Sequence, residues 1–179
     1  MKEKITSKKF NLKKTKIFII LSVCLGIILV FSFCTTNHTE YYYKYKYLQK
    51  RGDFDPITYS TIDYKCSKEE KEEVAGVMET AKKVFTYTGS EKDADKNVGE
   101  LSRYYIFSAP SYEIDHVNLN LDLITAKVRH NSGFMWVVYS DWHCDSQGNK
   151  LSGSDDILCY WKIKKINGKW TVVKIKEAV

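Results

Sequence analysis

The sequence predicts an α+β fold in which an N-terminal transmembrane helix precedes a curved antiparallel sheet of about four strands packed with two helices. Three observations lead to this fold class. Residues 17–34 carry no charge, apolar residues recur with helical spacing after Ser67, and they recur with a period of two after Val117. The expected segments are a basic stretch (1–16), an anchor (17–34), a Tyr-rich juxtamembrane linker (35–65) and one folded domain (66–179).

The apolar run from Ile17 to Cys34 is expected to cross the membrane as a helix. At a rise of about 1.5 Å per residue it spans roughly 27 Å, close to a hydrocarbon thickness of about 30 Å. Seven Lys and one Glu precede it, whereas residues 35–39 contain no Lys or Arg. This asymmetry predicts a cytoplasmic N-terminus and a C-terminal domain on the extracellular side of the cell membrane.

Two alternatives to an uncleaved anchor stay open. A cleaved secretory signal has a shorter apolar stretch and small residues before the cut, which this run does not offer. A lipoprotein signal places a small residue before the modified cysteine, but Phe33 precedes Cys34 and Val23 precedes Cys24. Tyrosines interleaved with lysines over residues 41–47 suit a membrane interface, or form a linker that is merely Tyr-rich.

The charge distribution argues against nucleic-acid binding. The net charge of +6 resides in residues 1–16, which leaves residues 17–179 neutral, with no excess for a phosphate backbone. The chain also lacks a Gly-rich phosphate loop and a G-x-S-x-G motif, so the sequence predicts no cofactor.

The first expected helix begins after Ser67, because Ser67 and Glu70 have the form of a capping box. Gly89 is expected to end it. Its apolar face follows helical spacing through Val74, Val77, Met78, Ala81, Val84 and Phe85.

A second, shorter helix is expected to begin at Asp95 or Asn97. Pro110 ends it, because the residue before a proline is disfavoured in the helical conformation. The apolar residues on it are Val98, Leu101, Tyr104 and Tyr105.

The strands follow from alternation. Apolar residues occupy odd positions from Val117 to Leu123 and even positions from Ile124 to Val128, a slip that predicts a β-bulge. A turn over 131–133 leads to a strand over 134–143. A loop over 145–154 then leads to two strands, 157–166 and 170–175.

Asn167 and Gly168 predict a two-residue hairpin turn between the last two strands. In that register Ile163 faces Val172 and shares its face with Trp161. Neither face of this hairpin is cleanly polar, so the sheet is expected to be partly covered on both sides. The face that holds the core stays open.

The closing segment 160–173 (YWKIKKINGKWTVV) resembles the final hairpin of the nuclear transport factor 2-like superfamily. The strand and loop before it are similar to small bacterial members that sit behind one anchor. The resemblance covers residues 66–179 and implies a cone-shaped α+β roll. It also implies an apolar pocket that in family enzymes holds a carboxylate base and a Tyr or acidic donor.

Six residues of suitable type are candidates for lining such a pocket. A general base needs reach to its proton, and the tryptophans are most simply core residues or, alternatively, stacking platforms for a ligand. The candidates are Tyr104, Trp136, Asp141, Trp142, His143 and Trp161.

Three cysteines follow the apolar run, so they cannot all pair within one chain. A Cys144–Cys159 disulfide with Cys66 as a spare thiol and three reduced cysteines both stay open. The segment His143-Cys144-Asp145 lacks the paired ligand spacing of a structural zinc site, so no metal is predicted.

Two functions remain. The first is a non-enzymatic module, anchored at the outer membrane face, that binds a protein partner of the cell envelope, as the resemblance implies. The alternative is a small-molecule-binding or isomerase-like domain that uses the cone pocket. A filled cone with an exposed apolar patch favours the first, and a deep cavity containing Asp141 or His143 favours the second.

Overall fold

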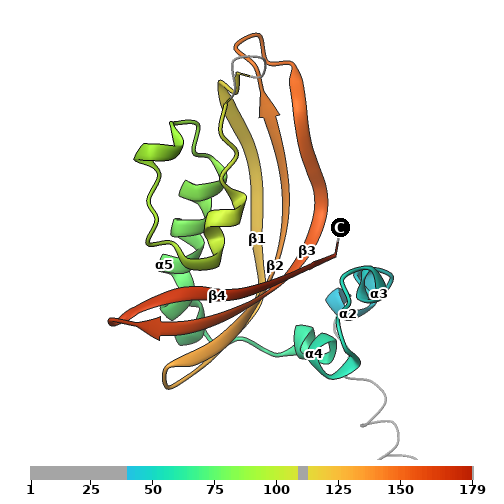
Figure 1. Ribbon diagram of the computed structural model, residues 1–179. Helices are drawn as coiled ribbons and strands as arrows, with labels where there is room; N and C mark the ends of the chain where they lie inside the picture. Colours follow the sequence, from blue (N-terminus) through green and yellow to red (C-terminus); the bar gives the residue numbers. More distant parts are fainter. Residues whose placement is uncertain (1–39, 109–112, 179) are drawn as a thin grey trace, which may run out of the picture. The chain divides into compact units, whose positions relative to one another are not determined.

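A four-stranded antiparallel sheet dominates the fold (Figure 1). The computed structural model describes residues 40–108 and 113–178, and the expected anchor over 17–34 lies outside them. Within those described ranges, no helix combines the length and the apolar character that a membrane crossing requires. The α+β class with four strands is confirmed.

The strands are paired in chain order, as the sequence predicts. β3 begins earlier than expected, because residues 150–154 pair with the end of β2 and shorten the expected loop to 145–149. The preceding turn is formed by His130 and Asn131, so β2 also starts early. The strands are β1 (His116–Arg129), β2 (Ser132–Cys144), β3 (Lys150–Ile166) and β4 (Lys169–Ala178).

The predicted bulge in β1 is confirmed at Ile124, where the register shifts between Leu123 and Thr125. The final hairpin has the predicted two-residue turn, with Asn167 at φ 50° and Gly168 at φ 80°. It also has the predicted register, with Ile163 opposite Val172.

A further shift places Val173 outside the ladder, because Lys162 pairs with Lys174 while Ile163 pairs with Val172. Ile175 therefore lies on the face of Trp161. A regular strand would have placed it on the face of Tyr160.

Helix α5 (Lys68–Phe85) begins with the predicted capping box. The Glu70 N–H donates to Ser67 Oγ at 3.2 Å, and the Ser67 N–H donates to Glu70 Oε2 at 2.9 Å. The helix ends at Phe85, before Gly89, and the buried side chains are on its predicted face. They are Val74, Val77, Ala81, Val84 and Phe85.

The second expected helix is a six-residue 3₁₀-helix, η3 (Gly99–Tyr104), which follows the short 3₁₀ turn η2 (Glu91–Asp93). Asp95 Oδ1 accepts the Asn97 N–H at 2.8 Å, which stabilises a turn there. Gly99 then adopts φ 62°, and a Cβ at that position would lie 2.4 Å from the Val172 carbonyl oxygen. The close approach to β4 therefore requires glycine in a conformation that interrupts an α-helix.

Residues 40–65 differ most from expectation, because they are folded rather than extended as a linker. Asp55 caps one of the short helices by accepting the Thr58 N–H at 2.8 Å, and Pro56 follows at the first helical position. The helices are α2 (Glu40–Lys44), α3 (Leu48–Arg51), α4 (Pro56–Ser60) and the 3₁₀ turn η1 (Thr61–Asp63).

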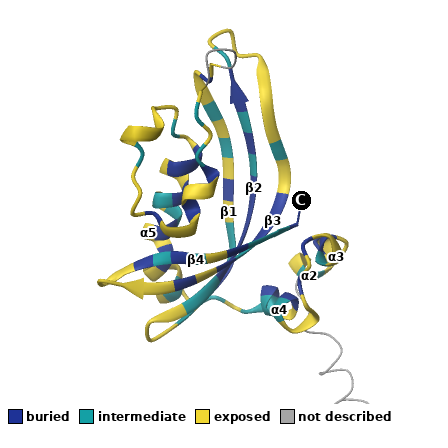
Figure 2. Cartoon of the chain, viewed as in Figure 1, coloured by how far each residue is buried: buried dark blue, intermediate teal, exposed yellow. Residues whose placement is uncertain are grey.

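The sheet is covered on both faces, as the pattern of its last hairpin predicts (Figure 2). One core lies beneath α5 and η3 and includes Leu101, Met135 and Trp161. The second core lies beneath the N-terminal helices. Its buried members are Tyr45, Leu48, Phe54, Tyr59, Ile62, Trp136, Val138, Leu158 and Ala178.

Candidate functional site

The six pocket candidates lie on both faces of the sheet and therefore do not line one pocket. Tyr104 and Trp161 are buried in the core beneath α5, whereas Trp136 is buried in the second core. Asp141 and His143 continue the α5 face along β2, and Trp142 between them points to the other face, because side chains alternate along a strand.

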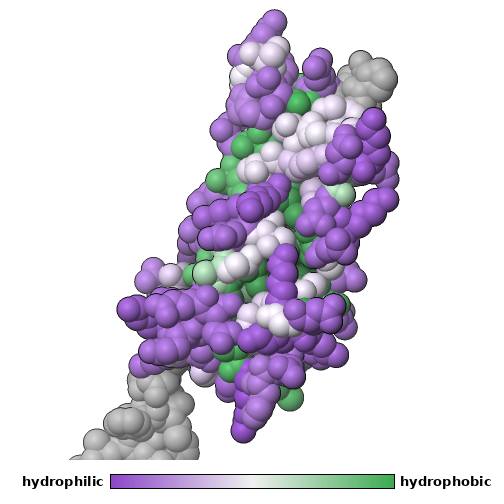
Figure 3. Space-filling model, turned by 90° about the vertical axis from the view of Figure 1, so that its left-hand side faces the viewer, coloured by the Kyte–Doolittle hydropathy of each residue, from purple (hydrophilic) through white to green (hydrophobic). Residues whose placement is uncertain are grey.

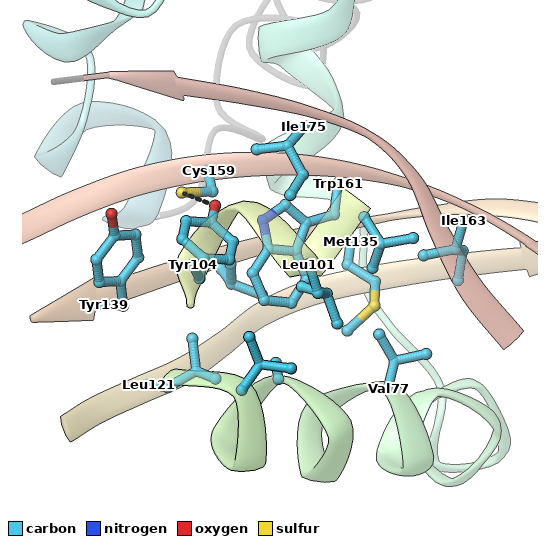
Figure 4. Close-up of a cluster of buried hydrophobic side chains, with 14 of the residues drawn as sticks. Val77, Leu101, Tyr104, Leu121, Met135, Tyr139, Cys159, Trp161, Ile163 and Ile175 are labelled. Carbon is cyan, nitrogen blue, oxygen red and sulfur yellow. Dashed lines mark hydrogen bonds between the residues drawn. The ribbon is translucent and has the colours of Figure 1, made fainter. Parts of the chain in front are cut away.

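Side chains fill the space between α5 and the sheet (Figure 4). Trp161, Met135 and Leu101 occupy its middle and are at most 1% exposed. A cavity beneath η3 and β4, bounded by Val77 and Trp170, has a volume of about 10 Å³, enough for one water molecule at most. The part of the interior where the resemblance implies a pocket is thus a packed core.

A carboxylate that the sequence analysis did not single out lies at the edge of this core. Glu177 Oε1 accepts a hydrogen bond from Tyr104 Oη at 2.6 Å and from Tyr139 Oη at 3.4 Å. Cys159 Sγ donates to the same oxygen at 3.5 Å, and Arg103 Nη2 lies 3.7 Å from Oε2. We call these five residues the Glu177 cluster.

The donors of the Glu177 cluster stay protonated at neutral pH. Burial raises the pKa of Tyr104 and of Tyr139, and the nearby charges of Cys159 and Glu177 add to the effect. Burial, and then the charge of Glu177, raises the pKa of the Cys159 thiol well above its usual value. A carboxylate already engaged by three donors and an arginine is held in place. It therefore has little freedom to accept a proton from a substrate.

The sequence held one signal for Glu177, namely that it continues the alternation of β4 beyond Ile175. The expected strand ended at Ile175, so this glutamate was left out. Tyr139 was not singled out from the sequence, and Cys159 was considered as a disulfide partner of Cys144.

Asp141 and His143 form a buried polar row with β3, at 5% and 2% exposure. His143 Nε2 lies 3.6 Å from Asp141 Oδ2, and His143 Nδ1 lies 3.1 Å from Ser152 Oγ. Asp141 Oδ1 accepts the Ser154 N–H at 3.0 Å. Each polar group therefore has a cross-strand partner, and the row stabilises the far end of the sheet.

The Cys144–Cys159 disulfide is not formed, and Cys66, Cys144 and Cys159 are all free thiols. The register explains this outcome. Cys159 pairs with Val137, seven residues from Cys144 along β2, which corresponds to about 23 Å of strand. A disulfide needs Cα atoms within about 7 Å.

Side chains of metal-ligating type are scattered over the described portion of the chain. In that portion, no three His, Cys, Asp or Glu side chains are grouped so that they could hold a metal ion. His143 and Cys144, which the sequence analysis weighed as ligands, face different sides of β2 and are engaged by Ser152 and by the Trp142 carbonyl.

An aromatic and basic surface covers the N-terminal helices. Tyr43 and Tyr47 are 59% and 65% exposed, whereas Tyr45 and Leu48 point inward and are buried. We call this the N-terminal surface. Its members are Tyr41, Tyr43, Lys46, Tyr47, Lys50 and Arg51.

The α5 side differs from this surface. Figure 3 shows hydrophilic residues over most of that side, with hydrophobic residues visible as narrow strips between them. Exposed large apolar residues elsewhere include Ile57, at 82%, and Ile166, at 47%.

Comparison with known proteins finds no match: no family model, no curated protein and no solved structure is significantly similar to the chain.

Proposed function

We propose that the chain is a single-pass, membrane-anchored extracytoplasmic binding module, without catalytic activity, that works in an envelope-associated complex. One observation carries the proposal. The described part of the chain is already helical at Glu40, so no more than residues 35–39 separate this folded part from the expected anchor. Five residues reach at most about 18 Å, whereas a linker over 35–65 would have reached about 100 Å. The domain would be held close to the membrane.

The N-terminal surface supports this placement. Tyr43 and Tyr47 expose rings with a polar tip, and Lys46 and Lys50 stand beside them, a combination suited to the boundary between headgroups and water. On this proposal the N-terminus is cytoplasmic, and the sheet domain is displayed on the extracellular side of the cell membrane.

We propose membership of the nuclear transport factor 2-like superfamily on the element order alone. A helix precedes a bent four-stranded sheet, and the chain closes with the NG hairpin at Asn167. The filled interior favours a member that binds a protein through its outer surface, because a packed core offers no room for a substrate.

One observation favours the alternative, a small-molecule-binding or isomerase-like domain. Tyr104 and Tyr139 direct their hydroxyl groups at Glu177, which is the pairing of residue types that the resemblance implies. Opening of the core around Trp161 would be needed before a ligand could reach them.

The test uses the full-length protein in its native membrane, with a photo-crosslinking amino acid at Ile57, Ile166 or Lys82 in turn. Ile57 and Ile166 are exposed apolar positions, and Lys82 on α5 is the control. We expect one adduct of defined mass from an apolar position and none from Lys82. An absence of adducts at all three positions contradicts the binding proposal.

The intact mass of the same protein tests the anchor. Retention of residues 17–34 supports it. Cleavage after the apolar run, or a lipid on Cys34, replaces it with a secretory or a lipoprotein signal.

A further inference from the structure

The sheet face beneath the N-terminal helices carries a recess, which shares Tyr41 with the N-terminal surface and Tyr139 with the Glu177 cluster. It has a volume of about 310 Å³ and lies between α2 and strands β1, β2 and β3. Known ligand pockets range from about 300 to 1,000 Å³, so this recess fits a compact molecule. Its apolar floor includes Val138 and Ile124, and its rim is polar. We call it the α2 recess.

Two irregularities of the sheet shape the α2 recess. The Ile124 bulge lies on its β1 side, and on its β3 side Asp156 adopts φ 49° where the register shifts between Tyr139 and Asp141. Bulges and positive φ at a non-glycine residue recur beside functional sites, where they redirect side chains.

The β3 side of the rim is held in place by hydrogen bonds. The Asp156 N–H donates to Ser140 Oγ at 2.9 Å, and Ser140 Oγ donates to Asp155 Oδ1 at 2.9 Å. The backbone that carries Asp156 is therefore fixed before any ligand arrives.

The two ends of the recess differ in charge. Lys44 on α2 lies over the Tyr45 ring at 4.9 Å, and the Tyr45 hydroxyl, followed by Asp156 and Glu40, raises the pKa of Lys44. Lys44 is therefore a stable cation on the Asp156 side. Asp122 stands on β1, two strands and about 10 Å away from Asp156.

Asp122 and its neighbour Asn120 have no ion-pair or hydrogen-bond partner among the residues that the structure describes. The β1 end of the recess thus presents an unpaired carboxylate beside an amide, while the α2 end presents the Lys44 ammonium group with the Asp156 carboxylate on the same side. Between them, Tyr41 offers a ring that is 43% exposed.

We propose that the α2 recess binds a small zwitterion, with its ammonium group on Asp122 and Asn120 and its carboxylate or phosphate group on Lys44. The short carbon chain between the charges lies on the apolar floor and against Tyr41. A molecule with one charge would satisfy one end only. Two sources have this chemistry, namely a free amino acid and the phosphoethanolamine headgroup of a lipid.

The test measures binding to the full-length protein in nanodiscs of phosphatidylglycerol, whose headgroup carries no ammonium group. The zwitterionic probes are γ-aminobutyrate and phosphoethanolamine, and the single-charge probes are butylamine and butyrate. We expect both single-charge probes to bind about tenfold more weakly than γ-aminobutyrate. A lower Kd for phosphoethanolamine than for γ-aminobutyrate assigns the lipid headgroup, and the reverse assigns a free amino acid.

Two exposed substitutions separate the ends of the site. Asp122→Asn is expected to weaken the binding of γ-aminobutyrate and butylamine about tenfold and to leave the binding of butyrate unchanged. Lys44→Gln is expected to weaken the binding of γ-aminobutyrate and butyrate about tenfold and to leave the binding of butylamine unchanged. Glu79→Gln and Lys82→Gln on α5 remove the same charges outside the recess and serve as controls.

Three results would overturn the proposal. Neither zwitterion binds saturably, or the single-charge probes bind as tightly as γ-aminobutyrate, or neither substitution changes the Kd of γ-aminobutyrate. None of these readouts involves a protein partner. The α2 recess and the proposed binding module can therefore fail independently.

Discussion

The two faces of the sheet are closed by different means. Beneath α5, one 18-residue helix covers the sheet with regularly spaced aliphatic side chains. On the other face, aromatic rings surround one indole, and they come from α4, from the loop before it and from β3. Phe54, Tyr59 and Tyr160 lie 5.0, 5.9 and 5.1 Å from the Trp136 ring, all in edge-to-face or steeply tilted geometry.

This difference explains where function can reside. The long helix leaves no usable space beneath it, since side chains fill the interior. The short helices cover their face incompletely, and the α2 recess is the part that they leave open. The face that sequence periodicity does not predict is the one with room for a ligand.

The largest expected effect on stability concerns the two central tryptophans, one on each face of the sheet. Trp136 and Trp161 are both 0% exposed, one on each face, so Trp136→Ala and Trp161→Ala should each lower the free energy of unfolding by about 3–5 kcal/mol. Urea unfolding of the full-length protein in detergent measures both. The half-buried Trp142→Ala, which removes a cation–π contact with Lys150, is the control and should cost less. A loss below about 1 kcal/mol for Trp136→Ala would mean that residues 40–65 do not belong to the cooperative core.

The fold beneath α5 was predictable because its signals are long or chemically specific. The Ser67 capping box, the apolar face of α5 and the Asn167–Gly168 turn each depend on several residues acting together. Residues 40–65 gave no such signal, since a helix of five residues is too short to establish a period.

The candidate site was predicted by residue type and not by position. Parity along β2 already separates Trp136 and Trp142 from Asp141 and His143, so one pocket could not contain all four. The α2 recess depends on Asp156 at positive φ and on a register shift, and neither leaves a mark in the sequence.

The second test uses pH to probe the two buried tyrosines of the Glu177 cluster. Burial raises the pKa of Tyr104 and Tyr139 above the usual 10.0, so the unfolded chain loses these protons first. The contribution of these tyrosines to the free energy of unfolding is complete below pH 10.0. Above that pH it declines by about 1.4 kcal/mol per pH unit for each tyrosine. Between about pH 10 and about pH 11, Tyr104→Phe and Tyr139→Phe should each make the free energy of unfolding fall less steeply with rising pH.

The matched control is Tyr47→Phe, because the Tyr47 ring belongs to the N-terminal surface and is 65% exposed. An equal slope in all three variants would show that the Glu177 cluster opens to water before the protein unfolds.

A third test compares the indole hydrogen bonds on the two faces of the sheet. Trp136 Nε1 donates to Thr61 Oγ1 at 2.9 Å, and Trp170 Nε1 donates to Glu73 Oε2. Thr61→Val leaves a fully buried donor without a partner and should cost about 1–3 kcal/mol. Glu73→Gln keeps an acceptor at a half-exposed site and should cost less. The reverse order in urea unfolding would indicate that η1 packs loosely on the sheet.

The smallest effect concerns the helix caps and asks whether the two faces unfold together. Ser67→Ala removes the cap of α5 and should lower the free energy of global unfolding by about 1 kcal/mol. Asp55→Ala removes the cap of α4, whose one buried side chain, Tyr59, packs in the second core. Hydrogen exchange should therefore show faster opening of residues 56–60 alone in Asp55→Ala, and a uniform change across α5 and the sheet in Ser67→Ala. If Asp55→Ala also accelerates exchange throughout the sheet, the short helices are as cooperative as α5. The recess between α2 and the strands would then be as rigid as the filled core on the other face.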